Sequence, residues 1–216
     1  MSDAPATKII AISRQQGSGG SYIGRAVAER LGFRYFDREL LRAAAEYLRE
    51  HEHSSQPDRP RGDSWFERLT NFFTVGSLDT GYVPPSPMVL YEGEVVEIEN
   101  RLIREIADDH AAVIVGRGAA QILRGRRGVV TVFVHAPEPW RVERVQQVYK
   151  TATHTAALRM VQQSDRERTR FIRRMAEIEW ADTRGYDLAI DSMTLGWDAA
   201  VDMIVGAVAG RRLHSV

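Results

Sequence analysis

KIIAISRQQGSGGSYIGRAVAERLG, residues 8–32, is the part of the chain from which its architecture can be worked out. Residues 8–13 form an apolar, β-prone run, and the segment that follows them is rich in glycine and serine. Ile23, Val27 and Leu31 then recur at the spacing of a helix that buries one face. These residues therefore predict a strand, a glycine-rich loop and a helix, in that order.

The remainder of the chain continues this alternation. Gly32 is expected to end the first helix, and Asp37 is a suitable cap for a second one. Four more apolar runs are predicted to be strands, at residues 33–36, 112–115, 129–135 and 186–192. Helical spacing is found around 40–48 and 89–109, from about 140 onward, within 154–180 and at 197–213. Because parallel strands need crossover connections and those here are helical, we predict an α/β fold: a five-stranded parallel sheet with helices on both faces.

One segment departs from the alternation. Residues 50–87 are polar and rich in turn residues, with helical spacing only at 65–73, which predicts an inserted mobile segment. A chain of 216 residues is long enough to bury one substantial core. We therefore expect a single domain, with a core of about 8–49 and 110–216 and a helical insert of about 50–109.

Composition narrows the classes of partner and location. The 29 basic and 29 acidic residues cancel, so no overall field attracts nucleic acid or an anionic membrane. The chain has no cysteine, which excludes disulfides and thiolate metal sites. Its first residues lack the pattern of a signal peptide, and no apolar run reaches the roughly 20 residues that a membrane span needs. We expect a cytoplasmic protein whose anion sites are local.

The glycine-rich loop carries the main chemical signal. Residues 14–21, RQQGSGGS, join the first strand to the first helix, and their glycines allow backbone N–H groups to converge on phosphate oxygens. That geometry suits a nucleoside triphosphate. The P-loop pattern G-x-x-x-x-G-K-[ST] is not met, since Arg14 replaces the first glycine and Gly20 replaces the lysine.

Two other interpretations of the loop compete with a triphosphate site. The loop is also what a tight turn between a strand and a helix looks like. A dinucleotide-binding site is the other competitor, because Asp37 lies about twenty residues beyond the loop. The pattern G-x-G-x-x-G of such sites fails, however, since Tyr22 occupies the place of its third glycine.

Arginines supply the second signal. Arg117 follows a buried strand between two glycines, where a guanidinium can bind phosphate through two hydrogen bonds. A further series is spread over the two helical segments that follow the fourth predicted strand: Arg141, Arg144, Arg166, Arg168, Arg170, Arg173 and Arg174. Most such runs are solvated helix faces, but phosphoryl transfer needs cations of this kind to stabilise the charge of the transferred group.

At this point the sequence resembles the cytidylate kinase-like proteins, relatives of the P-loop nucleoside monophosphate kinases. The resemblance covers most of the chain and rests on stretches in the family's order: ISRQQGSGGSYIGRAVAERLG, YFDREL, VIVGRGA, VFVHAPEPWRVERV, and SDRERTR through WADTRGYDLAIDS. It implies a P-loop NTPase-like core, a nucleotide-binding segment after the second strand and an arginine-bearing lid at about 150–180. It also implies transfer of phosphate from ATP to CMP or dCMP with Mg²⁺.

The resemblance assigns roles to individual residues. The donor phosphates would lie on the loop residues Gly17, Ser18, Gly19, Gly20 and Ser21, with the Ser21 hydroxyl near the metal. Arg117 matches the arginine that holds the acceptor phosphate, and Gly118 replaces the aspartate that follows it in the family. Asp37 matches an aspartate near the acceptor, and Arg42 falls one place from a phosphate-binding arginine. Arg141, Arg144, Asp165 and Arg168 fall in the lid region, and the catalytic candidates are Arg14, Arg117, Arg141 and Arg168.

The missing lysine requires another cation on the transferred phosphate. Arg14, which adjoins the loop, is the first candidate, ahead of Arg25 and the lid arginines. Two functional hypotheses follow. The first is a kinase that binds small-molecule nucleotides; the second is a nucleotide-binding regulatory or sensing protein with little catalysis, acting as a homodimer in one version.

Overall fold

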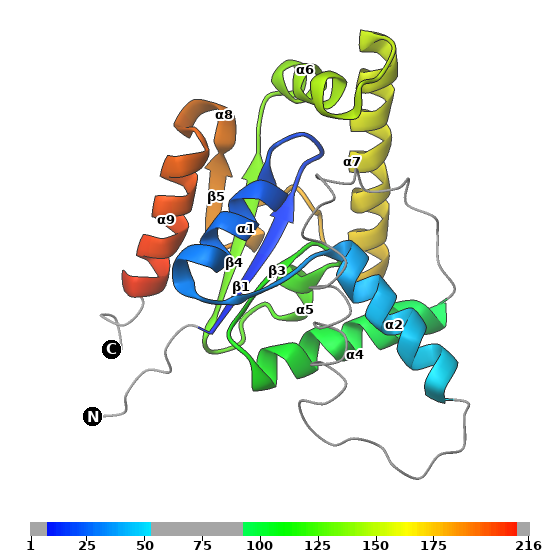
Figure 1. The fold of residues 1–216 in the computed structure, drawn as a ribbon, viewed down its shortest axis with the longest axis vertical. Helices are drawn as coiled ribbons and strands as arrows, with labels where there is room; N and C mark the ends of the chain where they lie inside the picture. The colour runs from blue at the N-terminus through cyan, green and yellow to red at the C-terminus, as the bar shows by residue number, and fades with distance from the viewer. Residues whose placement is uncertain (1–7, 53–92, 211–216) are drawn as a thin grey trace.

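The computed structural model describes residues 8–52 and 93–210. The expected helical turn at 65–73, most of the inserted segment, and residues 89–92 and 211–213 of two predicted helices lie outside this part of the chain. Five strands form one parallel sheet in the described residues, in the order β2-β3-β1-β4-β5 (Figure 1). Their bounds are β1 Ile9–Arg14, β2 Arg34–Phe36, β3 Ala112–Val115, β4 Val129–His135 and β5 Leu188–Asp191. The predicted α/β class is confirmed.

Helices connect the strands, as the sequence predicts. The long ones are α1 Gly20–Leu31, α2 Arg38–Glu52, α4 Gly93–Asp109, α6 Glu138–Tyr149, α7 His154–Ala176 and α9 Trp197–Gly210. Two short helices were not predicted, α5 Ala119–Ile122 and α8 Ser192–Leu195, and a 3₁₀ turn covers Thr183–Gly185. Four residues are too few to show helical periodicity. Within the described ranges, no helix combines the length and apolarity that crossing a membrane requires.

The two faces of the sheet are covered by different helices, because successive side chains of a strand point to opposite sides. Ile10 and Ile12 of β1 pack with α1 and α9, whereas Ile9 and Ala11 pack with α2, α4 and α5. Figure 1 shows α1 and α9 together on one side of the sheet. This double cover explains why the strands are continuous apolar runs without alternation.

The register of the sheet determines where a ligand can bind. β1 is the central strand, and it pairs with β3 through Ile12 and Val115 and with β4 through Arg14 and Val134. The chain continues to one side of β1 through β2 and β3 and to the other through β4 and β5. In such sheets, ligands bind at the carboxyl edge where the strand order reverses, which here is the end of β1.

Two predicted helix boundaries are confirmed by their hydrogen bonds. Gly32 ends α1 in the left-handed conformation, with φ of 66°, and its N–H donates to carbonyls of the last turn. Asp37 caps α2, because the Leu40 N–H donates to its Oδ1 at 3.1 Å. The second helix therefore starts at the carboxyl end of β2, close to the loop that follows β1.

Candidate active site

The loop between β1 and α1 needs glycine for its shape. Gly17 and Gly19 have φ of 85° and 80°, a region that other residues rarely adopt. The space beside each is also filled: a Cβ on Gly17 would lie 2.7 Å from the Arg141 carbonyl oxygen, and one on Gly19 would lie 2.7 Å from Nε1 of Trp197. The loop is thus held tightly between α6 and the start of α9.

The first turn of α1 presents backbone N–H groups that no described residue accepts. The first intrahelical bond of this region runs from Ile23 N–H to the Gly19 carbonyl at 3.0 Å. Within residues 8–52 and 93–210, the amides of Gly19, Gly20, Ser21 and Tyr22 have no acceptor. These amides and the partial positive charge of the helix end attract an anion such as a phosphate.

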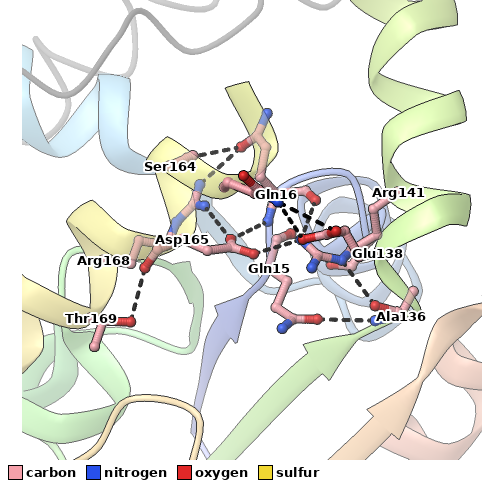
Figure 2. A network of polar contacts seen from close by, with 11 residues as sticks. Gln15, Gln16, Ala136, Glu138, Arg141, Ser164, Asp165, Arg168 and Thr169 are labelled. Carbon is pink, nitrogen blue, oxygen red and sulfur yellow. Dashed lines mark hydrogen bonds and ion pairs between the residues drawn. The ribbon is translucent and has the colours of Figure 1, made fainter. Parts of the chain in front are cut away.

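The other side of the loop is docked onto α7, as Figure 2 shows. The Gln16 N–H donates to Oδ1 of Asp165 at 3.0 Å, although the two residues are 149 positions apart. The Gln16 side chain accepts from Arg168 Nη2 at 3.0 Å and donates to the Tyr149 hydroxyl at 2.7 Å. One loop amide is therefore satisfied by a carboxylate of the protein itself, and α7 covers this end of the loop.

Arg141 is the centre of that docking. Its Nη1 donates to Asp165 Oδ2 at 2.6 Å and to the Gln16 carbonyl at 3.0 Å, and its Nε donates to the Ala136 carbonyl at 2.9 Å. The residue is only 5% exposed. This geometry makes Arg141 a brace between α6, α7 and the loop. Its predicted catalytic role stays a prediction.

A recess that opens to solvent lies beside the loop at the ends of β1 and β3. Arg14, Arg38 and Arg168 line it, together with Phe171 and Trp180. Burial, with the nearby Arg14 second and Arg38 contributing, lowers the pKa of Arg168 to about 9, against the effect of Asp165. Three guanidiniums crowded in one recess repel each other, which favours an anionic occupant.

Arg117 also lines this recess, but its guanidinium has a partner. It forms an ion pair with Glu99 of α4, and the two side chains are 5% and 1% exposed. Its Cζ lies 5.3 Å from the centre of the Phe171 ring. The predicted contact with an acceptor phosphate is untested, and the pair with Glu99 is what places this arginine in the wall of the recess.

The two α2 candidates lie in different settings. Asp37 caps the helix, and Arg42 donates from Nε to Glu46 Oε1 at 2.8 Å along its half-exposed face. Neither is among the residues lining the recess, whereas Arg38 of the same helix is. Both assignments to acceptor binding stay predictions.

Sequence reasoning missed Arg38 and Glu99. Arg38 follows the second strand at once, and the end of a parallel strand is where site residues gather, so its position was a usable signal. Glu99 lies among the buried apolar positions Val95, Ile98 and Leu102 of α4. An acidic residue on an apolar helix face indicates a buried cationic partner.

Ser21, the candidate metal ligand, is the second residue of α1 and is half-buried. No group of three or more acidic or histidine side chains in the described ranges is arranged to hold a metal. A lone hydroxyl next to open amides fits Mg²⁺, which keeps most of its waters and binds phosphate oxygens with few protein ligands.

These features define a class of protein. A parallel sheet whose central strand ends in a glycine-rich loop, a helix start with open amides and an adjacent cationic recess form a kinase-like P-loop fold. Residues 9–194 match the cytidylate kinase-like family, and the chain belongs to that family. The resemblance noted in the sequence is thereby confirmed. A search of the curated proteins finds no match.

Solved structures share this fold at low sequence identity. An uncharacterized protein from Eubacterium ventriosum ATCC 27560 is 23% identical, with a TM-score of 0.68 over 93% of this chain and 98% of its own. TT1252 from Thermus thermophilus is 18% identical, with a TM-score of 0.51 over 96% and 98%. A gluconokinase from Sinorhizobium meliloti 1021 is 17% identical, with a TM-score of 0.50 over 94% and 92%. These likenesses show the fold alone.

Proposed function

We propose that this protein is an ATP-dependent phosphotransferase that acts on a nucleoside monophosphate. The observation that carries the proposal is the juxtaposition of two anion-attracting features at the end of β1. One is the set of open amides at the start of α1, and the other is the recess lined by Arg14, Arg38 and Arg168. Transfer between two phosphates needs two such sites side by side.

One feature binds the phosphate donor and the other binds the acceptor. The amides of Gly19, Gly20 and Ser21 bind the donor phosphates, and Arg38 and Arg168 of the recess bind the acceptor phosphate. An acceptor oxygen then attacks the γ-phosphorus, and the bond from that phosphorus to the bridging oxygen breaks, so that ADP leaves. The guanidiniums stabilise the negative charge that spreads over the transferred group.

Family membership favours CMP or dCMP as the acceptor. Phe171 and Trp180 give the recess an aromatic wall beside its charges, which suits a phosphate attached to a planar base. Ser21 is the residue that would hold Mg²⁺ with the donor phosphates. The metal, when bound, neutralises charge on those phosphates.

A panel of acceptors tests this function. ADP formation from ATP and Mg²⁺ is measured with CMP, dCMP, UMP, AMP and GMP, and with shikimate and gluconate as acceptors of another class. We expect turnover with at least one pyrimidine monophosphate. Turnover only with an acceptor that is not a nucleotide would overturn the acceptor assignment.

A second function is favoured by two specific observations. Gly20 replaces the P-loop lysine, and the Gln16 amide is occupied by Asp165. Both suit a protein that binds a nucleotide to regulate or sense, with little catalysis. Calorimetry that detects ATP binding, combined with no ADP formation for any acceptor, would favour this function over the kinase.

A further inference from the structure

Arg14 and Gly20 occupy each other's usual places in the P-loop pattern. In G-x-x-x-x-G-K-[ST], the first position is glycine and the seventh is lysine. Here the first position is Arg14 and the seventh is Gly20. The loop therefore has one long cation and one glycine at these two positions, as the pattern does, but in the opposite order.

The structure gives a steric reason for this exchange. A Cβ on Gly20 would lie 2.5 Å from Cβ and 3.0 Å from Cγ of Arg14. The stem of Arg14 thus fills the space in which a side chain at position 20 would begin. Cβ of Arg14 is fixed by β1 and has little freedom to move, so these two positions accommodate one side chain between them.

The position of the Arg14 guanidinium is also clear from its neighbours. A Cβ on Gly116, at the end of β3, would lie 2.9 Å from Cζ of Arg14. The side chain therefore passes from the loop across Gly116 into the recess that it lines. No acidic residue in the described ranges forms an ion pair with it. Its charge remains available to a ligand of the loop.

We propose that Arg14 supplies, from the end of β1, the cation that a lysine supplies in the ordinary P-loop, and that Gly20 and Gly116 are glycines because this side chain runs across them. The ligand is the β- and γ-phosphates of a nucleoside triphosphate bound at the start of α1. This inference rests on the proposed function. It goes further by stating that the two loop positions were exchanged as a pair.

The steric half of the proposal is tested without any ligand. Gly20→Ala is made in the natural chain and in Arg14→Gly, and the melting temperatures are compared. We expect Gly20→Ala to destabilise the natural protein and to have little effect once the Arg14 side chain is gone, because the short contact then no longer exists. Equal losses in the two backgrounds would overturn the steric coupling.

The cation half is tested by exchanging the positions back. ATP binding with Mg²⁺ is measured by calorimetry on the full chain for Arg14→Gly, Gly20→Lys and the double variant, which has an ordinary P-loop. Each single variant should bind ATP at least about tenfold more weakly, and the double variant should recover most of the loss. Arg34→Ala is the matched control, because it removes an exposed arginine at the amino end of β2, whereas the recess lies at the carboxyl edge of the sheet.

The outcomes separate this inference from the proposed function. If the natural protein binds ATP and Arg14→Gly binds it equally well, the exchange is wrong and the kinase assignment stands. If Arg14→Gly raises the KM for the acceptor and leaves the affinity for ATP unchanged, Arg14 binds the acceptor and the inference is wrong. If the natural protein binds no ATP, the proposed function and this inference fall together.

Discussion

At the scale of single residues, the buried pair of Arg117 and Glu99 is the most sensitive feature of the recess. Both side chains are almost fully removed from solvent, so each charge depends on the other. The pair connects α4, whose apolar face packs against α2, to the end of β3. Loss of either charge affects the fold as well as the recess.

Glu99→Gln should therefore destabilise the protein strongly. Removing one partner of a buried ion pair leaves the other charge without its counter-charge, which costs about 3–5 kcal/mol. Chemical denaturation measures the change in the free energy of unfolding. Glu179→Gln is the control, because its pair with Arg173 is 62% and 61% exposed and should contribute little. A similar small effect for both variants would contradict the structural role given to Glu99.

At the scale of elements, the Asp165 carboxylate is the main link between α7 and the glycine-rich loop, beside the hydrogen bond from Arg168 to the Gln16 side chain. Asp165 accepts from the Gln16 amide, from Arg141 and from Arg168, which brings three segments to a single side chain. Thr153 caps the same helix by accepting from the Ala156 N–H at 3.1 Å, so α7 begins independently of the loop. Its position over the loop depends on Asp165.

Asp165→Asn should loosen this docking while preserving the shape of the side chain. Hydrogen bonds to an ionised group are roughly twice as strong as neutral ones, so the loss of charge should speed hydrogen exchange of the Gln16 amide about tenfold. Amides of β4 should exchange at unchanged rates. Asp182→Asn, which removes a half-buried carboxylate beyond the end of α7 that makes no contact with Gln16, is the control. Unchanged exchange at Gln16 would mean that the docking does not depend on the charge.

At the scale of the whole molecule, the recess concentrates positive charge in a chain whose charges otherwise cancel. Burial and the neighbouring Arg14 and Arg38 lower the pKa of Arg168 from its ordinary value to about 9. Between about pH 9 and that ordinary value, the unfolded chain binds more protons than the folded one. At neutral pH the charged Arg168 therefore lowers the free energy of unfolding by its full amount. The stability of the unliganded protein rises as the pH increases through about 9.

An anion in the recess should remove this penalty. Sulfate, which does not titrate in this range, should raise the melting temperature more than chloride at matched ionic strength. The extra increase should shrink as the pH passes above the pKa of Arg168, because the guanidinium loses its charge. Arg168→Gln should show a smaller and pH-independent increase, which separates binding from general salt effects. The same pH dependence in both proteins would contradict a role for Arg168 in the anion site.

Local patterns accounted for most of the scaffold. The strands at 112–115 and 129–135 have the bounds expected from their apolar runs, and Asp37 caps α2 as its side chain predicts. Such features depend on a few adjacent residues and on burial, which sequence periodicity reports directly. Short helices such as α5 were not predicted, because a single turn is too short to show helical periodicity.

The contacts of the site join residues that are far apart in the chain, and local patterns did not predict them. From its own residues, the chain specified the alternation of strands and helices, the parallel sheet, and a glycine-rich loop leading into a helix at the end of the first strand. Folding in three dimensions brought Asp165 to Gln16, Glu99 to Arg117 and the stem of Arg14 against Gly20. Periodicity and capping act between near neighbours, whereas ion pairs and steric exclusion depend on distances between residues that only the packed sheet and helices bring together.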